Sequence, residues 1–277
     1  YKGGGVPLDL IDPSFDSINP DDKVGLAMKV CEEIYGKDKR IISSNGSYGD
    51  EKSFKYMVAS NGFEGESANS SFTLVGNVSI KGEGDARPES YWYDSSIYYN
   101  ELQKDGIGTK SIERVLQKLG QQKIASGKYA MVVDNMNSSR LLSPVIGALY
   151  GSAIQQKNSF LLDKQDKLVL GSNVTIKDEP HLVKAEGARY FDNEGVATTP
   201  RAIFNEGVLN TYFIDTYNAN KMQVKSTISS PSILTMQHGM KDVNGLVASL
   251  GKGILVTGFN GGNCNSTTGD FSYGIEG

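Results

Sequence analysis

The chain has 277 residues, of which 38% are hydrophobic and 22% are charged, and its formal net charge is −4. This length suits one large or two modest domains with a real hydrophobic core. Lys and Arg are scattered rather than clustered, which argues against a nucleic-acid-binding face. No apolar run approaches the roughly 18 residues of a membrane span. We therefore expect neither nucleic acid nor a membrane as a partner.

Two cysteines, Cys31 and Cys264, are too few for a disulfide framework. The chain starts at Tyr1 rather than Met, so we expect a processed or truncated chain whose true start is not represented.

The first predicted element is a helix over residues 20–35. Asn19 suits its N-cap, Pro20 its first position, and Gly36 its end. Cys31 lies on its expected apolar face and is interpreted as a small buried hydrophobe. The members of that face are Val24, Ala27, Met28, Cys31, Ile34 and Tyr35.

An antiparallel meander is predicted next, from short β-like runs at residues 54–60, 71–80 and 90–99. Trp92 could be part of a binding platform, but an aromatic strand residue more often packs against its neighbours. A second helix is expected over residues 109–120. Its apolar face consists of Ile112, Val115, Leu116 and Leu119.

Residues 121–128 resemble a linker and divide the chain into domains at 1–122 and 123–277. The second domain should hold a strand over 129–134, then a helix over 138–156 that Pro144 either starts or kinks. Strands are expected at residues 173–178, 208–215 and 253–259. The fold class is therefore α+β, with an amino-terminal domain of helices and antiparallel sheet and a mostly β carboxyl-terminal domain.

The last twenty residues combine two patterns. Small polar residues predict an irregular loop over 258–269. Phe271, Tyr273 and Ile275 then alternate with polar residues, which predicts a half-buried strand. This stretch is either a binding loop or a plain surface hairpin.

Catalytic residues are hard to find in the sequence. His181 and His238 are far apart and lack companions at metal-ligand spacing. The acidic stretches at 177–180 and 191–195 could supply paired carboxylates, although acidic turns are usually solvated. The residues by themselves do not reveal an enzyme.

A resemblance adds more. The segments "FDNEGVATTPRAIFNEGVLNTYFID" and "TTGDFSYGIEG", with "YAMVVD" and "SRLLSPVIGALYG" before them, resemble the TldD/PmbA family, whose members are often labelled modulators of DNA gyrase. The resemblance covers essentially the whole chain. Complete members extend past both ends, so we expect this chain to be a fragment.

This resemblance implies where a metal site would lie. TldD-type members are zinc metalloproteases with His-Glu-x-x-x-His on the helix that follows the "YAMVVD"-like strand. Here Ser143, Pro144 and Ala148 occupy those positions. The departure matches the PmbA or TldE branch, which lacks the motif and pairs with a TldD-type subunit. The resemblance thus implies a non-catalytic subunit that binds no metal itself, with zinc in the partner.

Partners and location follow from the same resemblance. It implies a dimer with a TldD-type subunit or with a second copy, acting on small or unfolded polypeptides in the cytoplasm. Asn263, Asn265, Thr268 and Asp270 are candidates for binding peptide or partner, or they stabilise their own loop. Two alternatives stay open. One is a stand-alone peptide-binding or scaffold protein, and the other is an enzyme that uses the acidic stretches.

Overall fold

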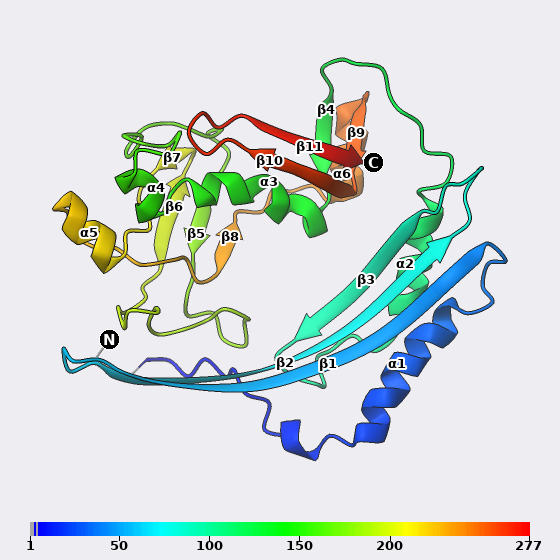
Figure 1. Cartoon of the computed structure of the whole chain (residues 1–277), viewed down its shortest axis with the longest axis horizontal. Coiled ribbons are helices and arrows are strands. Elements are labelled where there is room, and N and C mark those ends of the chain that lie inside the picture. The colour runs from blue at the N-terminus through cyan, green and yellow to red at the C-terminus, as the bar shows by residue number, and fades with distance from the viewer. Residues whose placement is uncertain (1–2, 4) are drawn as a thin grey trace.

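The computed structural model describes residues 3 and 5–277, which form two parts with separate hydrophobic cores (Figure 1). The first part contains the short 3-10 turn η1 (Phe15–Ser17), helices α1 (Pro20–Ile34) and α2 (Ile107–Leu116), and strands β1 (Ile41–Val58), β2 (Glu64–Ile80) and β3 (Glu89–Ser96). The second part runs from β4 onward. The α+β class is confirmed.

Helix α1 begins as predicted but turns a different face to the core. The Asn19 side chain accepts a hydrogen bond from Asp21 N at 3.0 Å, and the helix ends at Ile34. Its buried residues are Leu26, Val30 and Ile34, spaced four apart along one narrow stripe.

The apolar face predicted for this helix is therefore partly wrong. Val24 and Met28 are each 58% exposed and Tyr35 is 81% exposed. The reason is that α1 approaches β1 closely at Gly46. A Cβ on Gly46 would lie only 2.2 Å from the Ala27 carbonyl oxygen, so the side of α1 that carries Ala27 lies against β1. Cys31 is half-buried there rather than fully buried, and its Sγ accepts a hydrogen bond from Gly46 N.

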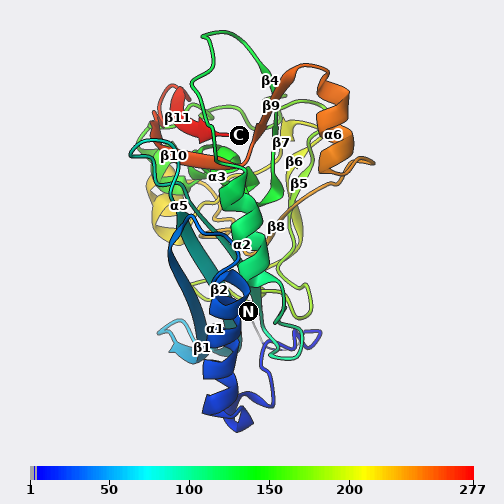
Figure 2. The same ribbon diagram turned by 90° about the vertical axis from the view of Figure 1, so that its right-hand side faces the viewer.

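The sheet of the first part is antiparallel in the order β1-β2-β3. Its strands are much longer than the short runs predicted. Residues 41–53 contain many Gly, Ser and Asn and lack a strand signal, yet they pair residue by residue with β2. Helices α1 and α2 cover one face only (Figure 2). On that face β2 buries Phe72, Leu74, Val78 and Ile80.

The second part holds three small sheets. The bounds of its elements are β4 (Ala130–Val133), α3 (Asn135–Gly147), α4 (Gly151–Gln155), β5 (Ile176–Asp178), β6 (Arg201–Asn205), β7 (Val208–Leu209), α5 (Thr216–Met222), β8 (Leu234–Met236), α6 (Val243–Leu250), β9 (Gly253–Val256), β10 (Gly258–Cys264) and β11 (Phe271–Glu276). Strands β7-β6-β5-β8 form one sheet, β4 and β9 pair in parallel, and β10 and β11 form a hairpin.

Several predictions for this part are wrong in their bounds. The strand expected over 173–178 is shortened to β5, and the one expected over 253–259 is divided between β9 and β10. The helix expected over 138–156 is split into α3 and α4, because residues 148–150 turn to meet Phe213. Phe213 N donates to Leu149 O at 3.0 Å, and Gly151 N donates to Phe213 O at 2.7 Å. For the same reason the strand expected over 208–215 stops after Leu209, and the segment that follows is a buried connection.

The terminal hairpin also differs from its prediction. Residues 258–264 form strand β10 rather than a loop, and the pairing with β11 is irregular between Asn260 and Asn263. Gly262 adopts φ +102°, and a Cβ there would lie 2.2 Å from the Ser272 carbonyl oxygen. Strand β11 is confirmed, but Phe271 and Ile275 are 56% and 43% exposed instead of facing a core.

The β1–β2 hairpin reaches across to the second part at its tip (Figure 1). The Phe63 and Phe191 rings lie 5.1 Å apart edge to face, and Lys55 Nζ donates to Asn193 Oδ1 at 3.0 Å. At the opposite end of the sheet, Arg114 of α2 contacts Asp134 of the second part at 3.2 Å, so the two parts meet at both ends.

Among the described residues, no helix is long and apolar enough to cross a membrane.

Candidate functional site

Two of the three positions where the resemblance placed a zinc motif, Ser143 and Pro144, lie in helix α3, and the third, Ala148, directly follows its end. Asp134 caps the helix by accepting from Asn137 N at 3.0 Å, and the helix is already running when it reaches Pro144. Ser143 is exposed and its hydroxyl donates to Arg140 O at 3.2 Å. Ala148 is only 2% exposed and belongs to the core of the second part. The first and last positions thus face different surroundings, solvent and core.

These residues do not fit a zinc ion. Zinc sites in proteins use thiolate, imidazole or carboxylate ligands. A serine hydroxyl that donates to the backbone of its own helix, a proline ring and a buried methyl group supply none of them. Across residues 3 and 5–277, no group of three or more His, Cys, Asp or Glu side chains is arranged to hold a metal.

Three of the four loop candidates, Asn265, Thr268 and Asp270, lie at the tip of the β10–β11 hairpin and bond within it. Asn265 Oδ1 accepts from Thr267 N at 3.0 Å, and Thr268 Oγ1 donates to Asp270 Oδ2 at 2.7 Å. Asn263 is exposed and paired with Ser272 in the strand register. These bonds stabilise the loop itself, and a role in binding peptide or partner stays a prediction.

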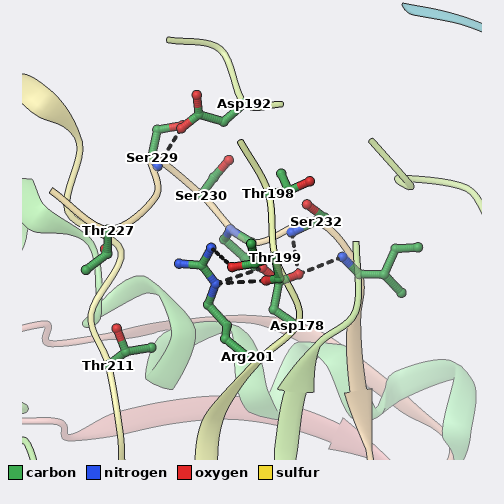
Figure 3. A network of polar contacts seen from close by, with 12 residues as sticks. Asp178, Asp192, Thr198, Thr199, Arg201, Thr211, Thr227, Ser229, Ser230 and Ser232 are labelled. Carbon is green, nitrogen blue, oxygen red and sulfur yellow. Dashed lines mark hydrogen bonds and ion pairs between the residues drawn. The ribbon is translucent and has the colours of Figure 1, made fainter. Parts of the chain in front are cut away.

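The first acidic stretch is not solvated. Asp178, in β5, is 1% exposed, and its Oδ1 accepts from Ser232 N at 2.8 Å and Ile233 N at 3.1 Å (Figure 3). Its Oδ2 accepts no hydrogen bond from the described residues, and Arg201 Nε lies 3.9 Å away. Burial therefore raises the pKa of Asp178, because the two backbone N–H groups and Arg201 compensate only in part.

The second acidic stretch is also buried at its aspartate. Asp192 is 1% exposed and accepts three backbone N–H groups, from Glu194, Val196 and Ser229, each at 2.9 Å. Burial raises its pKa, but these hydrogen bonds outweigh burial and leave the pKa lowered. Both aspartates thus hold loops in place, and the expectation that these turns are solvated is wrong for them.

The two histidines are not brought together as a site. Thr198 donates its hydroxyl proton to Arg189 O, so its oxygen is free to accept from His181 Nε2 at 3.0 Å. His238 is exposed beyond β8. His181 therefore has a structural hydrogen bond that ties two loop segments together.

A cavity lies between the two parts, at the end of the sheet opposite to the hairpin tip. It has a volume of about 640 Å³. One wall comes from the three strands of the first part, at residues 43–45, 77–79 and 89–92. The facing wall comes from the start of α3 and the base of the terminal hairpin, at residues 136–137 and 257–260. The floor includes Arg114 and Lys118 from α2.

Ion pairs join the floor of this cavity to the second part of the chain. The Arg114 guanidinium contacts Asp134 Oδ2 at 3.2 Å and donates to Thr257 O at 3.1 Å. Lys118 Nζ lies 2.6 Å from Glu276 Oε2. Burial raises the pKa of Glu276, but hydrogen bonds from Lys118 and Asn260 outweigh burial and lower it. The cationic groups on the floor are thus neutralised by carboxylates of the second part.

The sequence does not predict this cavity. Trp92 packs partly against the first core, as the sequence favours, but it also lines the cavity. The Arg114 guanidinium lies 5.4 Å from the centre of its ring. The walls come from segments far apart in the chain. The only sequence signal for this cavity is the run of aromatic residues around Trp92, which is compatible with a binding platform.

Comparison with known proteins places the whole chain in one family. The profile described as the PmbA/TldA metallopeptidase central domain matches residues 13–119. The profile described as the PmbA/TldA metallopeptidase C-terminal domain matches residues 126–277. Together they account for most of the sequence.

Relatives of known name belong to the same family. The chain is 31% identical over 265 residues to the metalloprotease PmbA homolog of Haemophilus influenzae, covering 94% of this chain and 58% of that protein. It is 28% identical over 274 residues to metalloprotease PmbA of Escherichia coli O157:H7, covering 98% and 60%. The chain therefore spans about 60% of the length of these relatives.

Solved structures share the fold. A protein of Bacteroides thetaiotaomicron described as a "putative modulator of DNA gyrase" is 63% identical, with a TM-score of 0.99 over 100% of this chain and 63% of its own. TldE from Thermococcus kodakarensis is 17% identical, with a TM-score of 0.80 over 99% of this chain and 64% of its own, which is a likeness of fold alone. With both profiles matched and these relatives alongside, the chain belongs to the TldD/PmbA family.

Proposed function

We propose that this chain is the non-catalytic, PmbA-like subunit of a TldD/PmbA-type proteolytic complex that acts on small or unfolded polypeptides in the cytoplasm. The catalytic zinc belongs to a TldD-type partner. One observation carries the proposal. The three motif positions hold Ser143, Pro144 and Ala148, and the outer two face solvent and core respectively.

The relatives support the same branch. Those named PmbA are 26–31% identical to this chain, whereas those named TldD homolog are 24–27% identical. The rival enzyme hypothesis needs carboxylates that a substrate can reach, and Asp178 and Asp192 are each 1% exposed. Both oxygens of Asp192 and one oxygen of Asp178 accept from backbone N–H groups, as is usual for buried polar groups.

Co-expression with a TldD-type protein from the same genome tests the proposal. The expected result is a stable complex that survives dilution to the micromolar range, contains about one zinc per TldD-type chain, and cleaves an unfolded polypeptide. This chain alone should form a homodimer without zinc or cleavage. A matched comparison changes the zinc-motif glutamate of the TldD-type chain to Gln, which should remove cleavage and leave the complex intact. Stoichiometric zinc in this chain alone, or failure of the two chains to associate, would refute the proposal.

A further inference from the structure

The two faces of the first sheet are chemically different. The face under α1 and α2 is apolar, and Gly46 and Gly76 face the helices there, since added Cβ atoms would touch Val30. The opposite face is uncovered where it lines the cavity and carries polar side chains. Because side chains alternate along a strand, the neighbours of these glycines, Asn45 and Asn77, point into the cavity.

A row of three polar side chains crosses the strands at this point. Asn45 is paired with Asn77, and Asn77 is paired with Tyr91. All three are exposed, and the amide groups of Asn45 and Asn77 have no hydrogen-bond partner in the described part of the chain. Strands lie about 4.8 Å apart, so the row spans roughly 10 Å, the length of about three residues of extended chain.

The chemistry of the cavity favours an uncharged ligand with both donors and acceptors. A side-chain amide offers the same groups as a peptide bond, one carbonyl oxygen and N–H donors. Arg114 and Lys118 are already paired with carboxylates, and the other two charged residues of the described lining, Arg87 and Glu89, have opposite signs. The cavity therefore carries no excess positive charge that would select an anionic ligand. Phe259 and Met136 add apolar surface on the facing wall. A volume of about 640 Å³ lies within the range of small-molecule and short-peptide sites.

We propose that this cavity binds a short extended segment of polypeptide, and that Asn45 and Asn77 recognise its main-chain amide groups. The segment lies across the three strands, against their polar face, with its side chains toward Met136 and Phe259. The choice of a polypeptide rather than another neutral ligand rests on the proposed function. The site itself rests on the cavity and its row of amides.

The chain contains a single tryptophan, Trp92, which lines this cavity from the edge strand β3, so its fluorescence responds to occupancy. The probe is the tripeptide Ala-Leu-Ser, acetylated and amidated at its ends, titrated into the chain without any partner. A saturable change in Trp92 emission is expected. Asn77→Leu and Asn45→Leu keep the side-chain size and should each weaken binding roughly 2- to 12-fold, the loss for one hydrogen bond.

Three controls sharpen the test. Asn205→Leu changes an exposed strand asparagine in the other sheet and should leave the affinity unchanged. The same tripeptide methylated on its main-chain nitrogens should bind more weakly, because it lacks N–H donors. Maltotriose, a neutral sugar of similar reach, should leave the emission unchanged. Melting curves confirm that each variant is folded before its affinity is compared.

Several results would overturn the inference. They are no saturable change with the tripeptide, equal binding of the methylated tripeptide, an unchanged affinity in both folded Asn→Leu variants, or preferential binding of maltotriose. Failure here is distinguishable from failure of the proposed function. A zinc-free chain that pairs with a TldD-type partner but shows no peptide-dependent emission refutes the cavity alone. A chain that binds the peptide but never pairs refutes the complex alone.

Discussion

Asp178 and Asp192 are buried to the same degree, each about 1% exposed, yet folding shifts their pKa values in opposite directions. Asp192 receives three backbone N–H groups shared between its two oxygens. Asp178 receives two on one oxygen and leaves the other to Arg201 at 3.9 Å. Burial alone therefore does not decide the state of a carboxyl group. The number and position of its donors do.

The largest expected effect on stability is at Asp192, whose carboxylate accepts three backbone hydrogen bonds. Asp192→Asn weakens three charge-assisted hydrogen bonds and turns an amide N–H₂ toward backbone donors. We expect a loss of about 2–4 kcal/mol in the free energy of unfolding at neutral pH. Urea denaturation followed by circular dichroism measures this loss. A loss below about 1 kcal/mol would show that the three backbone donors of Asp192 add little stability, and would contradict the difference drawn between Asp192 and Asp178.

A smaller effect is expected at the cation near Asp178. Arg201→Met leaves a buried carboxylate with less compensation, and we expect a loss of about 1–2 kcal/mol. Adding Asp178→Asn should recover part of that loss, because the uncompensated charge is then gone. A double-mutant cycle measures the coupling between the two side chains. Strictly additive losses would show that the 3.9 Å approach of Arg201 carries no energy.

The smallest effect is a difference in pH dependence. Folding lowers the pKa of Asp192, so its contribution to stability is present above the unfolded value near 3.8 and is lost as pH falls through the folded pKa. Folding raises the pKa of Asp178, so its contribution is greatest below 3.8 and declines as pH rises through the folded pKa. Denaturation midpoints from pH 3 to 7 should therefore show opposite slopes when wild type is compared with Asp192→Asn and with Asp178→Asn. Slopes of the same sign would contradict the assignment.

Local signals were sufficient for part of the fold. Asn19 and Pro20 mark the start of α1 through chemistry that acts within one turn, and the alternation at residues 271–276 marks β11. The extent of β1 could not be predicted, because residues 41–53 are strand only through their partners in β2. The break between α3 and α4 likewise depends on Phe213, far along the chain.

The candidate site was less predictable than the fold. The resemblance identified Ser143, Pro144 and Ala148 as departures from a zinc motif, but not that the first faces solvent and the last the core. Asp178 and Asp192 lie in polar sequence that suggests solvated turns, and their burial depends on the segment at 229–233 folding over them. Both parts of the chain line the cavity, so no single stretch of sequence signals it.

The contact at the tip of the β1–β2 hairpin also affects the order of events during synthesis. Lys55 and Asn193, which bond across the two parts, are 138 residues apart in the chain. At about 5–20 residues per second, a ribosome needs roughly 7–28 s to make the second after the first. The hairpin can close early, since its strands are adjacent, but Phe63 at its tip has no Phe191 to pack against until then. The nascent chain therefore presents an unprotected aromatic tip for seconds, an interval in which a chaperone that binds exposed aromatic residues would find its target.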